Sequence, residues 1–445
     1  MRYSLALQAL TLALCASGAI AGTWHVPGHF SSIQSAINFA SDGDVIQIAP
    51  GTYHQSFDLK GKAITVRGSG MSSTIIDGSG LNDTLIRCMS GEEASTVIED
   101  MTVRDGIGAF LLSFYQGGGL YVFNAKPTIR RIRFASNYAD GAGGGVSCFL
   151  ASPTIEDCIF INNEAGFGGD GGGAIAMQGG SPVIHRCRFL SNSSGFLGGA
   201  ISMVGSDVLI SDSLFVKNTA PMGAGARVSG GAPTFANCTF AYNESDATVS
   251  TSGSAVRSAS LAVTTIRNCV IWANTANPLV NLAGASTVAQ HSTIQGGYSG
   301  GLYISWQNPQ FGDPAGYDGI IGTEDDEFRL KPTSPCIDSG NNALVNGTVF
   351  DLLGRQRIAD GNGDQYDVVD HGAYEFLPST CPADCYPLGG DGIVNIDEII
   401  TLINNFGPTN SPCDIAPANA NGTYGNGSID IDDLVEVINS FGVCG

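Results

Sequence analysis

The sequence predicts a parallel β-helix, because one eleven-residue phrase returns at a nearly constant period. Its clearest copies share Pro at the first position, Ile at the third, Phe at the eighth and Asn at the last. The three clear copies and three weaker ones occupy 127–137, 153–163, 182–192, 208–218, 233–243 and about 264–274. Their asparagines are 26, 29, 26, 25 and 31 residues apart. A fixed period in this range indicates stacked supersecondary units, so the repeat decides the fold.

Each repeat contains two short strand signals separated by turns. The first is the repeated phrase, and the second follows a glycine-rich cluster. These clusters occupy 117–119, 143–145, 171–173, 198–199 and 223–225. In a parallel β-helix, neighbouring coils pair about 4.8 Å apart and like side chains stack into ladders. The recurring asparagine predicts such a ladder, with amides that satisfy turn backbone in their own coil and the next.

The chain ahead of the repeats predicts a short helix followed by strands. Residues 31–40 begin with two serines, which suit an N-cap. The apolar residues that follow have helical spacing, at Ile33, Ala36, Ile37 and Ala40. Asp42-Gly43-Asp44 ends this helix, and Val45 opens the first of several strands. A helix placed before stacked coils would cap their open apolar end.

Four segments of this opening carry a family resemblance: Thr23–Gly28, Ile33–Ile37, Gly43–Ile46 and Gly51–Tyr53. They resemble right-handed parallel β-helix proteins of the pectate-lyase-like superfamily, over most of 22–377. The resemblance implies an all-β right-handed parallel β-helix with a short N-terminal capping helix. It leaves the activity open, since lyases, hydrolases and adhesins share this fold. Residues 313–377 resemble the C-terminal closing segment of exported bacterial β-helix proteins, which implies a capping role.

The first 21 residues predict an export signal. Met1-Arg2 precedes an apolar run from Leu5 to Ala16, and Ala19-Ile20-Ala21 provides small residues before Gly22. The run is too short for a transmembrane helix, and no later stretch reaches the ~18 apolar residues that one needs. We therefore expect a protein that is secreted or held at the cell surface.

The charge balance limits the partners. The chain has 20 basic and 41 acidic residues, and removal of 1–21, with its single basic residue Arg2, leaves 19 against 41, or −22. Such a surface repels nucleic acid and anionic membranes and favours multivalent cations. It also disfavours a polyuronate unless calcium bridges the two.

The last 65 residues predict a second, small all-α domain. After a linker at 378–380, an acidic loop and apolar stretch at 391–406 are echoed at 426–441, with an offset of 35 residues. Two loop–helix units in tandem resemble a type I dockerin, so we assign 381–445 to a dockerin-like domain. The resemblance implies calcium and a cohesin-like protein partner.

The calcium ligands follow from the loop positions that supply oxygen atoms. The best matches are Asp391, Asn395 and Glu398 in the first loop and Asn426, Asp430 and Asp433 in the second. The first halves of both loops depart from the pattern, and Asp384 and Asp414 serve as first ligands only if extra residues bulge out. Two solvated acidic helix caps are the alternative.

Further oxygen-rich turns lie in the closing segment. Asp360, Asn362 and Asp364 form one group, and Asp318, Asp325 and Asp326 form another. Calcium and an unbound polar turn explain either group equally well.

The cysteines fall into two sets. Cys158, Cys187, Cys238 and Cys269 each stand two residues before the repeated Phe or Ile, so they share one structural column. They read as small buried core fillers, with a disulfide between coils as the alternative. In the tail, Cys381, Cys385, Cys413 and Cys444 favour disulfides, with three connectivities open.

Two further columns run along the coils. Arg131, Asp157, Arg186 and Asp212 align in consecutive copies and predict a solvent-facing ion-pair ladder that fixes register. Phe123, Phe149, Met177 and Met203 follow the glycine clusters. We expect them to point into the core, and an outward apolar stripe is the alternative.

Catalytic signals are sparse. The paired carboxylates of glycosidases and the acidic motifs typical of β-helix polygalacturonases do not occur in the coils. The residues we would first test for catalysis are Arg133, His185 and Arg188. The sequence thus supports two hypotheses: a carbohydrate-binding or scaffold protein attached through its tail, or a polysaccharide lyase or glycoside hydrolase delivered by that tail. We expect a monomer whose partners are extracellular polysaccharide or a cohesin-like module.

Overall fold

The computed structural model describes residues 21–377, apart from 109, 112, 113, 116, 168, 276 and 348. Further on it describes 393–394, 396–404, 407–408, 428–429, 431–439 and 442–443. The predicted linker at 378–380, the tail cysteines and all but the last residue of the predicted export signal lie outside these ranges.

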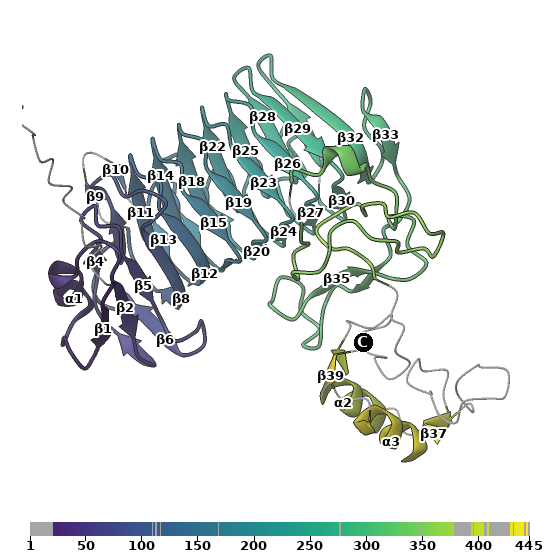
Figure 1. The fold of residues 1–445 in the computed structure, drawn as a ribbon. Coiled ribbons are helices and arrows are strands. Elements are labelled where there is room, and N and C mark those ends of the chain that lie inside the picture. The colour runs from purple at the N-terminus through teal and green to yellow at the C-terminus, as the bar shows by residue number, and fades with distance from the viewer. Residues whose placement is uncertain are drawn as a thin grey trace, which may run out of the picture.

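The described coils form a right-handed parallel β-helix, as predicted (Figure 1). Its largest sheet, sheet A, has 19 strands, and each full coil contributes to it twice. We call the part with the recurring Ile the first arm and the part with the recurring Phe the second arm. Strands β8 (Val97–Arg104), β12 (Thr128–Ala135) and β32 (Ser286–Ile294) run through both arms. Successive coils pair in register within each arm, so like positions stack.

The remaining strands divide among the two arms and two smaller sheets. The first arm holds β1 (Thr23–Val26), β2 (Val45–Ile48), β5 (Thr65–Arg67), β15 (Thr154–Glu156), β19 (Val183–His185), β23 (Leu209–Ser211), β26 (Thr234–Ala236) and β29 (Val263–Arg267). The last strand of the sheet, β33 (Leu302–Ser305), pairs with β32 across the bend between the two arms. The second arm holds β3 (Gly51–Tyr53), β6 (Thr74–Asp77), β16 (Ile159–Ile161), β20 (Arg188–Leu190), β24 (Leu214–Val216), β27 (Thr239–Ala241) and β30 (Val270–Trp272). Sheet B holds β4 (Phe57–Asp58), β7 (Ile86–Cys88), β11 (Leu120–Phe123), β14 (Val146–Phe149), β18 (Ile175–Gln178), β22 (Ile201–Val204), β25 (Ala226–Ser229), β28 (Val256–Ala259) and β31 (Leu279–Asn281). Sheet C holds β13 (Tyr138–Ala139), β17 (Glu164–Ala165) and β21 (Ser193–Ser194), and a separate hairpin pairs β9 (Phe110–Leu111) with β10 (Phe114–Tyr115).

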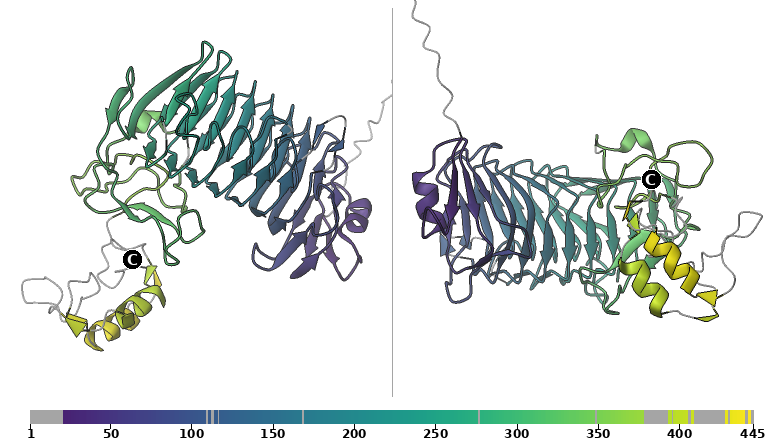
Figure 2. Two further views of the ribbon diagram at one scale, coloured as in Figure 1. Left: turned by 180° about the vertical axis from the view of Figure 1, so that it is seen from behind. Right: turned by 60° about the horizontal axis from the view of Figure 1, so that its bottom comes forward.

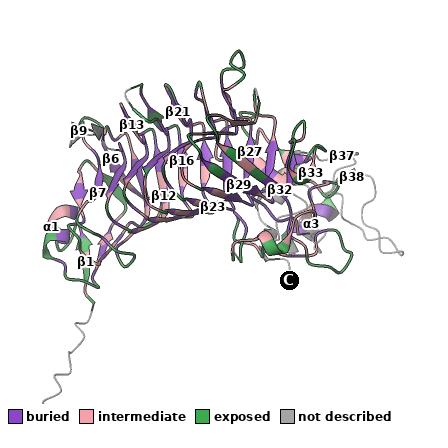
Figure 3. Cartoon of the chain, turned by 90° about the horizontal axis from the view of Figure 1, so that it is seen from above, coloured by how far each residue is buried: buried purple, intermediate pink, exposed green. Residues whose placement is uncertain are grey.

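The core is a stack of identical layers. In the second arm, the inward phenylalanines of successive coils stack with ring centroids 4.4 to 5.0 Å apart and nearly parallel planes. The stacked rings are Phe134, Phe160, Phe189, Phe215 and Phe240, and all are fully buried. Figure 3 shows the same pattern along the whole stack, with buried strands and exposed connections. Because successive coils bury similar side chains at equivalent positions, one short repeated phrase is enough to specify the β-helix.

The predicted asparagine ladder is confirmed. In the middle of the stack, Asn192 Nδ2 donates to the carbonyl of Phe160 and to Asn218 Oδ1. Its own Oδ1 accepts from the backbone N–H and the side-chain amide of Asn163. The same arrangement links Asn137 to the ladder at one end. These amides therefore satisfy turn backbone of the preceding coil, rather than of their own coil as predicted, and they bond to the amides of both neighbouring coils.

The cysteine column consists of free thiols, which confirms its interpretation as core filler. Cys158, Cys187, Cys238 and Cys269 are all buried and unpaired by disulfides. The Cys158 thiol donates to the carbonyl of Glu156 at 3.2 Å, and the Ser213 hydroxyl in the same column donates to the carbonyl of Ser211 at 2.7 Å. Serine and cysteine thus perform the same local task at this bend.

The predicted N-terminal helix is also confirmed. Helix α1 (Ile33–Phe39) begins after Ser32, whose hydroxyl accepts from the backbone N–H of Ser35. Ile33, Ala36 and Ile37 are buried against β1, β2 and β4. In Figures 1 and 2, α1 lies across the N-terminal end of the stack. It therefore covers the first coil, as a cap should.

The Phe/Met column is not a single column. Met177 and Met203 are buried, and Met177 pairs with Cys148 of the preceding coil. Phe149 pairs instead with Gln178, and it stacks on Phe123 at 5.8 Å on the outer side of sheet B. Alignment of the coils by their glycine clusters is wrong by one residue here, because Ala174 occupies the position that glycine holds in the coil before it. A shift of one residue moves a side chain to the opposite face of a strand.

The closing segment covers the flank of the second arm. It forms a hairpin of β34 (Phe311–Asp313) and β35 (Glu327–Leu330), followed by the short 3-10 helix η1 (Asn342–Leu344). Its apolar residues Phe328, Leu330 and Tyr374 share a core with outward residues of the coils. Those outward residues are Ala135, Ile161, Leu190, Leu214, Val216, Ala241 and Val270. The predicted capping role is thus a lateral one, which Figure 1 shows as loops beside β20 to β30.

The tail contains two equivalent helices. Helix α2 (Ile396–Asn404) and helix α3 (Ile431–Asn439) begin 35 residues apart, as the offset between the two copies predicts. Leu402 and Val437, which occupy equivalent positions, are both buried. Short strands flank the helices: β36 (Ile393–Val394) pairs with β39 (Gly442–Val443), and β37 (Gly407–Pro408) pairs with β38 (Ser428–Ile429).

Candidate functional site

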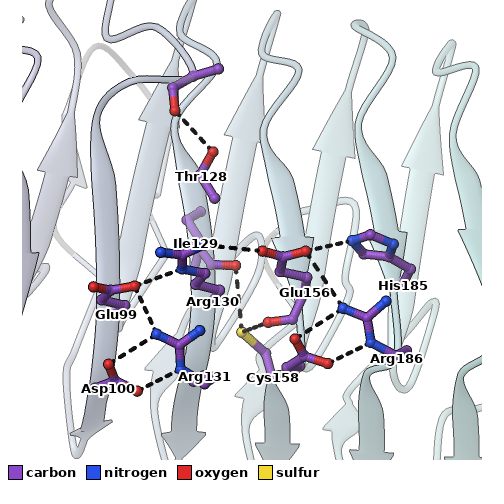
Figure 4. Close-up of polar contacts among 12 residues, drawn as sticks. Glu99, Asp100, Thr128, Ile129, Arg130, Arg131, Glu156, Cys158, His185 and Arg186 are labelled. Atoms are coloured by element: carbon purple, nitrogen blue, oxygen red, sulfur yellow. Dashed lines mark hydrogen bonds and ion pairs between the residues drawn. The ribbon is translucent and has the colours of Figure 1, made fainter. Parts of the chain in front are cut away.

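The exposed face of the first arm carries a network of charged side chains (Figure 4). At its centre, Glu99 has no exposed side-chain area and accepts from three arginines. The donors are Arg67, Arg130 and Arg131, at 2.5, 2.6 and 2.8 Å. Burial opposes ionisation of Glu99, but hydrogen bonds from Arg67 and Arg130 outweigh it and lower the pKa of the carboxyl. Glu99 therefore stays charged as the anchor of the network.

The network continues into the next two coils. His185 Nε2 lies 2.9 Å from Glu156 Oε2, and Arg186 holds Asp157 through its Nε at 2.7 Å. Arg131 holds Asp100 in the same way, also at 2.7 Å. Arg131, Asp157 and Arg186 all have a positive φ, near 50°, because they form the bend between the two arms. These paired charges therefore fix coil register at a bend where the backbone is strained.

The predicted ladder is confirmed only in part: Arg186 pairs with Asp157, but Arg131 pairs with Asp100 of the preceding coil, and the prediction is wrong for the fourth member. Asp212 occupies the next bend, with φ 48°, but it is fully buried. The closing segment covers it, and Arg357 Nε lies 3.4 Å from its Oδ1. The equivalent residues at neighbouring bends face solvent, so the sequence predicted the same for Asp212. It is buried because a segment more than 140 residues later in the chain folds over it.

Arg357 is the centre of a buried ionic cluster beneath the closing segment. Its Nη1 lies 3.7 Å from Glu375 Oε2, and its Nη2 donates to the carbonyl of Asp370. Loss of hydration by burial raises the pKa of both Asp370 and Glu375. Glu375 thereby holds a proton at neutral pH, since one guanidinium cannot compensate every carboxylate around it.

Two of the three candidate catalytic residues meet at the closing segment. Arg133 Nε pairs with Glu324 Oε1 at 2.5 Å, and Arg188 Nη1 donates to the carbonyl oxygen of the same glutamate at 3.3 Å. His185 lies on the first arm, beyond the bend, and contacts Glu156 instead. The structure therefore brings Arg133 and Arg188 together and leaves His185 apart; a catalytic role for any of them remains a prediction.

Arg188 also lines a cleft of about 340 Å³ between the second arm and the closing segment. We call it the arginine cleft; its lining residues are Arg188, Asp326, Glu327, Arg329, Leu353, Arg355 and Tyr374. Burial raises the pKa of Asp326, whose carboxylate accepts from the N–H of Gly322. This cleft gathers three guanidinium groups on a protein whose net charge is −21.

A second cleft of about 330 Å³ lies further along the same arm. We call it the aromatic cleft; it is lined by Tyr242, Trp272, Asn308, Gln310, Phe311, Pro314 and Lys331. Trp272 pairs with Ala241 of the preceding coil and so holds an outward position where earlier coils have smaller side chains. Tyr242 has φ 55°, an uncommon conformation for a bulky residue. The sequence interpretation missed both, although an aromatic residue at an outward position was a usable signal.

The oxygen-rich turns of the closing segment are occupied by their own backbone. Asp360 Oδ1 accepts from the N–H groups of Gly363 and Asp364, and Asn362 Oδ1 also accepts from Asp364. Asp325 Oδ2 accepts from the N–H of Asp318 in the same way. Across the described part of the chain, no three His, Cys, Asp or Glu side chains converge as a metal site. Calcium at these turns therefore remains a prediction.

The predicted calcium ligands of the tail mostly lie outside the described residues. Asp384, Asp391, Asn395, Asp414, Asn426 and Asp430 belong to that group. Glu398 lies in α2 and Asp433 in α3, and Asp433 is fully buried. The oxygen-rich composition of both loops suits Ca²⁺, which prefers carboxylate and amide oxygens.

None of the helices in the described ranges is long and apolar enough to cross a membrane. Residues 84–261 match the sequence model of the family described as "Right handed beta helix region". No curated protein sequence matches the chain.

Three solved structures are similar to this chain at low identity and low TM-score. A pectate lyase, Pel9A, is 15% identical over 80% of this chain and 96% of its own, with a TM-score of 0.40. A mannuronic acid specific polysaccharide family 6 lyase from human gut microbiota is 12% identical over 64% of this chain and 67% of its own, with a TM-score of 0.35. PfbA, a surface adhesin of Streptococcus pneumoniae, is 12% identical over 61% of this chain and 81% of its own, with a TM-score of 0.37.

Proposed function

We propose that this protein is exported and binds extracellular polysaccharide on the flank of its second arm. Its dockerin-like tail, with calcium bound in both loops, would attach it to a cohesin-like module of a larger assembly or of the cell surface. The observation that carries the binding function is the aromatic cleft at Tyr242 and Trp272.

The lining of this cleft suits a sugar ring. An aromatic face packs against the C–H groups of a pyranose, while amides donate to and accept from its hydroxyls. Tyr242 and Trp272 are half-buried, so their rings are held in place and still accessible. Asn308 and Gln310 supply the amides, and Lys331 adds a cation. The surface that the cleft exposes is mainly polar, so hydrogen bonds to sugar hydroxyls would contribute to binding alongside the two rings.

Binding is favoured over cleavage by the positions of the candidate catalytic residues. Arg133 is paired with Glu324, and His185 is held by Glu156 on the other arm. Neither side chain lines the arginine cleft or the aromatic cleft. Arg188, the third candidate, does line the arginine cleft, so the alternative of a lyase or hydrolase rests on that residue alone.

The tail helices support a docking role. Equivalent apolar residues of α2 and α3 are exposed in pairs: Ile400 and Val435 are 42% and 49% exposed, and Ile403 and Ile438 are 58% and 52% exposed. The members of each pair are 35 residues apart, so the same apolar surface is built twice. Exposed apolar surface that recurs in this way suits a protein partner.

The binding function is tested with Trp272→Ala. We expect the wild-type protein to be retarded in gels that contain the recognised polysaccharide, and the variant to lose at least tenfold in affinity, since loss of a stacked aromatic ring removes on the order of 1.5 kcal/mol or more. Trp306→Ala is the matched control, because Trp306 is an exposed tryptophan that does not line the cleft.

Equal loss of affinity in both tryptophan variants, or none in either, would remove the aromatic cleft from the proposal. Each polysaccharide is also incubated with the protein in calcium and in chelator. Release of unsaturated or reducing ends in either condition would replace binding by catalysis.

A further inference from the structure

The last coils of the β-helix carry no charge. Residues 268–312, which contain strands β30 to β33, include no Asp, Glu, Lys or Arg, and this is the longest such stretch in the chain. At the chain's average of 14% charged residues, a segment of this length would contain about six. Its one histidine, His291, has a pKa that burial lowers, so it is neutral at neutral pH. The net charge of −21 is therefore carried entirely by the rest of the chain.

Two strand edges are open at this end. Among the strands that the structure describes, β33 pairs only with β32 in sheet A, and β31 pairs only with β28 in sheet B. Figure 1 shows β33 as the outermost strand of the stack. Helix α1 covers the opposite end, whereas the closing segment lies on the flank and adds no strand to either edge. Open edges favour pairing with another chain, and proteins usually protect them with charged side chains, which this end lacks.

Apolar side chains at the same end are incompletely buried. Leu279 in β31 is half-buried, although Val256, its partner in the preceding coil, is almost fully buried. In β33, Leu302 is 55% exposed and Tyr303 is 76% exposed. Ile304 packs against the core and is also only partly buried. Removal of this apolar surface from water would favour a contact here.

The two open edges together indicate what covers them. They are the last strands of two different sheets, so one added peptide strand pairs with only one of them. The end of another β-helix presents strands around the same cross-section and can pair with both. In a second copy of this chain the N-terminal end is covered by α1, and elsewhere two copies of net charge −21 repel each other. Two copies can therefore meet at their uncharged C-terminal ends.

We infer that this protein forms a dimer in which the C-terminal ends of two β-helices pack together. The same surface is buried on both copies, so association stops at two chains and does not continue into a fibre. The inference departs from the monomer that the sequence predicts, and it goes beyond the proposed binding function. Trp272 of the aromatic cleft lies in β30, which pairs with β32, next to β33. A dimer would present two such clefts and gain avidity for a polysaccharide.

The test is sedimentation velocity of the full-length protein in chelator, at about 1 to 100 μM. We expect a dimer whose dissociation constant falls as salt is added, because salt screens the repulsion between two acidic copies. Leu302→Glu should raise that constant about tenfold or more, since it places a carboxylate on the open edge of each copy.

Two matched substitutions locate the contact. Leu150→Glu changes a leucine that is 56% exposed and follows β14, away from the end, and should leave the dissociation constant within about twofold. Ile403→Glu puts the same charge on exposed apolar surface of α2 in the tail, and it should also leave the dimer intact. An unchanged unfolding temperature shows that each variant is folded.

Hydrogen exchange of the wild-type protein gives a second measurement that needs no variant. The amides of β31 and β33 should exchange more slowly as the protein concentration rises, because pairing in the dimer protects them. If Leu302→Glu does not fold, this concentration dependence decides.

A wild-type protein that stays monomeric at every concentration in high salt, or a folded Leu302→Glu variant that dimerises like wild type, would overturn the inference. So would a dimer that Ile403→Glu abolishes, because the contact would then lie in the tail. Protection of β33 that does not depend on concentration would assign its edge to residues of the same chain, and that result also contradicts the dimer.

Discussion

The asparagine at the end of each repeat does more than any other single side chain to join the coils. Asn192 has no exposed surface, and its amide takes part in four hydrogen bonds across three coils. In the buried interior no water replaces those partners when the amide is removed. Stability at this scale is therefore set by the satisfaction of buried polar groups.

We expect Asn192→Ala to lower the free energy of unfolding by about 3 kcal/mol or more, since it leaves several buried donors and acceptors without partners. Denaturant unfolding measures this. Asn162→Gly is the control: Asn162 is an exposed neighbour with φ 55°, a conformation that glycine adopts freely, so its change should stay within about 0.5 kcal/mol. Comparable losses in both variants would show that the ladder is not the main support.

The buried carboxyl of Glu375 makes stability depend on pH. Burial raises the pKa of this carboxyl in the folded state from its usual 4.5 to about 10, so the folded protein binds a proton that the unfolded chain has released. The stabilisation that this proton gives to the folded state is complete below about pH 4.5 and is lost as the pH rises through the folded-state pKa.

Thermal unfolding followed from pH 5 to pH 9 should therefore show falling stability in wild type. Glu375→Gln, which mimics the protonated carboxyl, should flatten the profile and stabilise the protein most at high pH. Glu93→Gln, at an exposed position, should leave the profile as it is. A wild-type profile that rises over this range would contradict the assignment.

The closing segment is the element whose position the sequence did not reveal. Residues 313–377 have the composition of a terminal cap, and the structure places them along the flank of the second arm. The outward row under them is apolar, with Ile161, Leu190 and Val216, and an exposed strand would not hold such a row. That row was the available signal, but its meaning required knowledge of which positions face outward.

Leu190→Ala should lower the free energy of unfolding by about 2 to 4 kcal/mol, because the side chain is packed between the coil and the closing segment. Leu209→Ala is matched in residue type and also lies at an outward position, on the uncovered first arm, and should change stability by less than about 1 kcal/mol. Denaturant titration compares the two. If both variants lose the same amount, the flank is not held by this contact.

At the scale of the whole molecule, the chain combines a long β-helix with a small helical tail. The two tail helices are short, and each leaves apolar residues exposed. Helices of nine residues are marginal on their own, so their stability has to come from packing or from bound ions. Calcium in the two loops would supply part of it.

We expect the full-length protein to show a calorimetric transition that shifts to lower temperature by several degrees when calcium is chelated. A chain that ends at residue 377 should lack that transition and keep the unfolding of the β-helix unchanged in chelator. A transition that ignores chelation, or that survives the truncation, would argue against calcium in the tail.

The sequence by itself determined the features of this protein that recur from coil to coil. The period, the inward Phe and Ile positions, the asparagine ladder and the cysteine column follow from it, because in a stack each coil packs mainly on identical neighbours and local pattern becomes tertiary contact. The 35-residue echo of the tail gave its two helices for the same reason.

Tertiary structure alone decided what the non-repetitive part touches. The burial of Asp212, the separation of His185 from Arg188 and the two clefts all depend on where the closing segment folds back. Those contacts join residues more than a hundred positions apart and have no period, so no local pattern encodes them. A single-residue shift at Ala174 likewise exchanged core and surface in the Phe/Met column, since the two faces of a strand differ by one step of the chain.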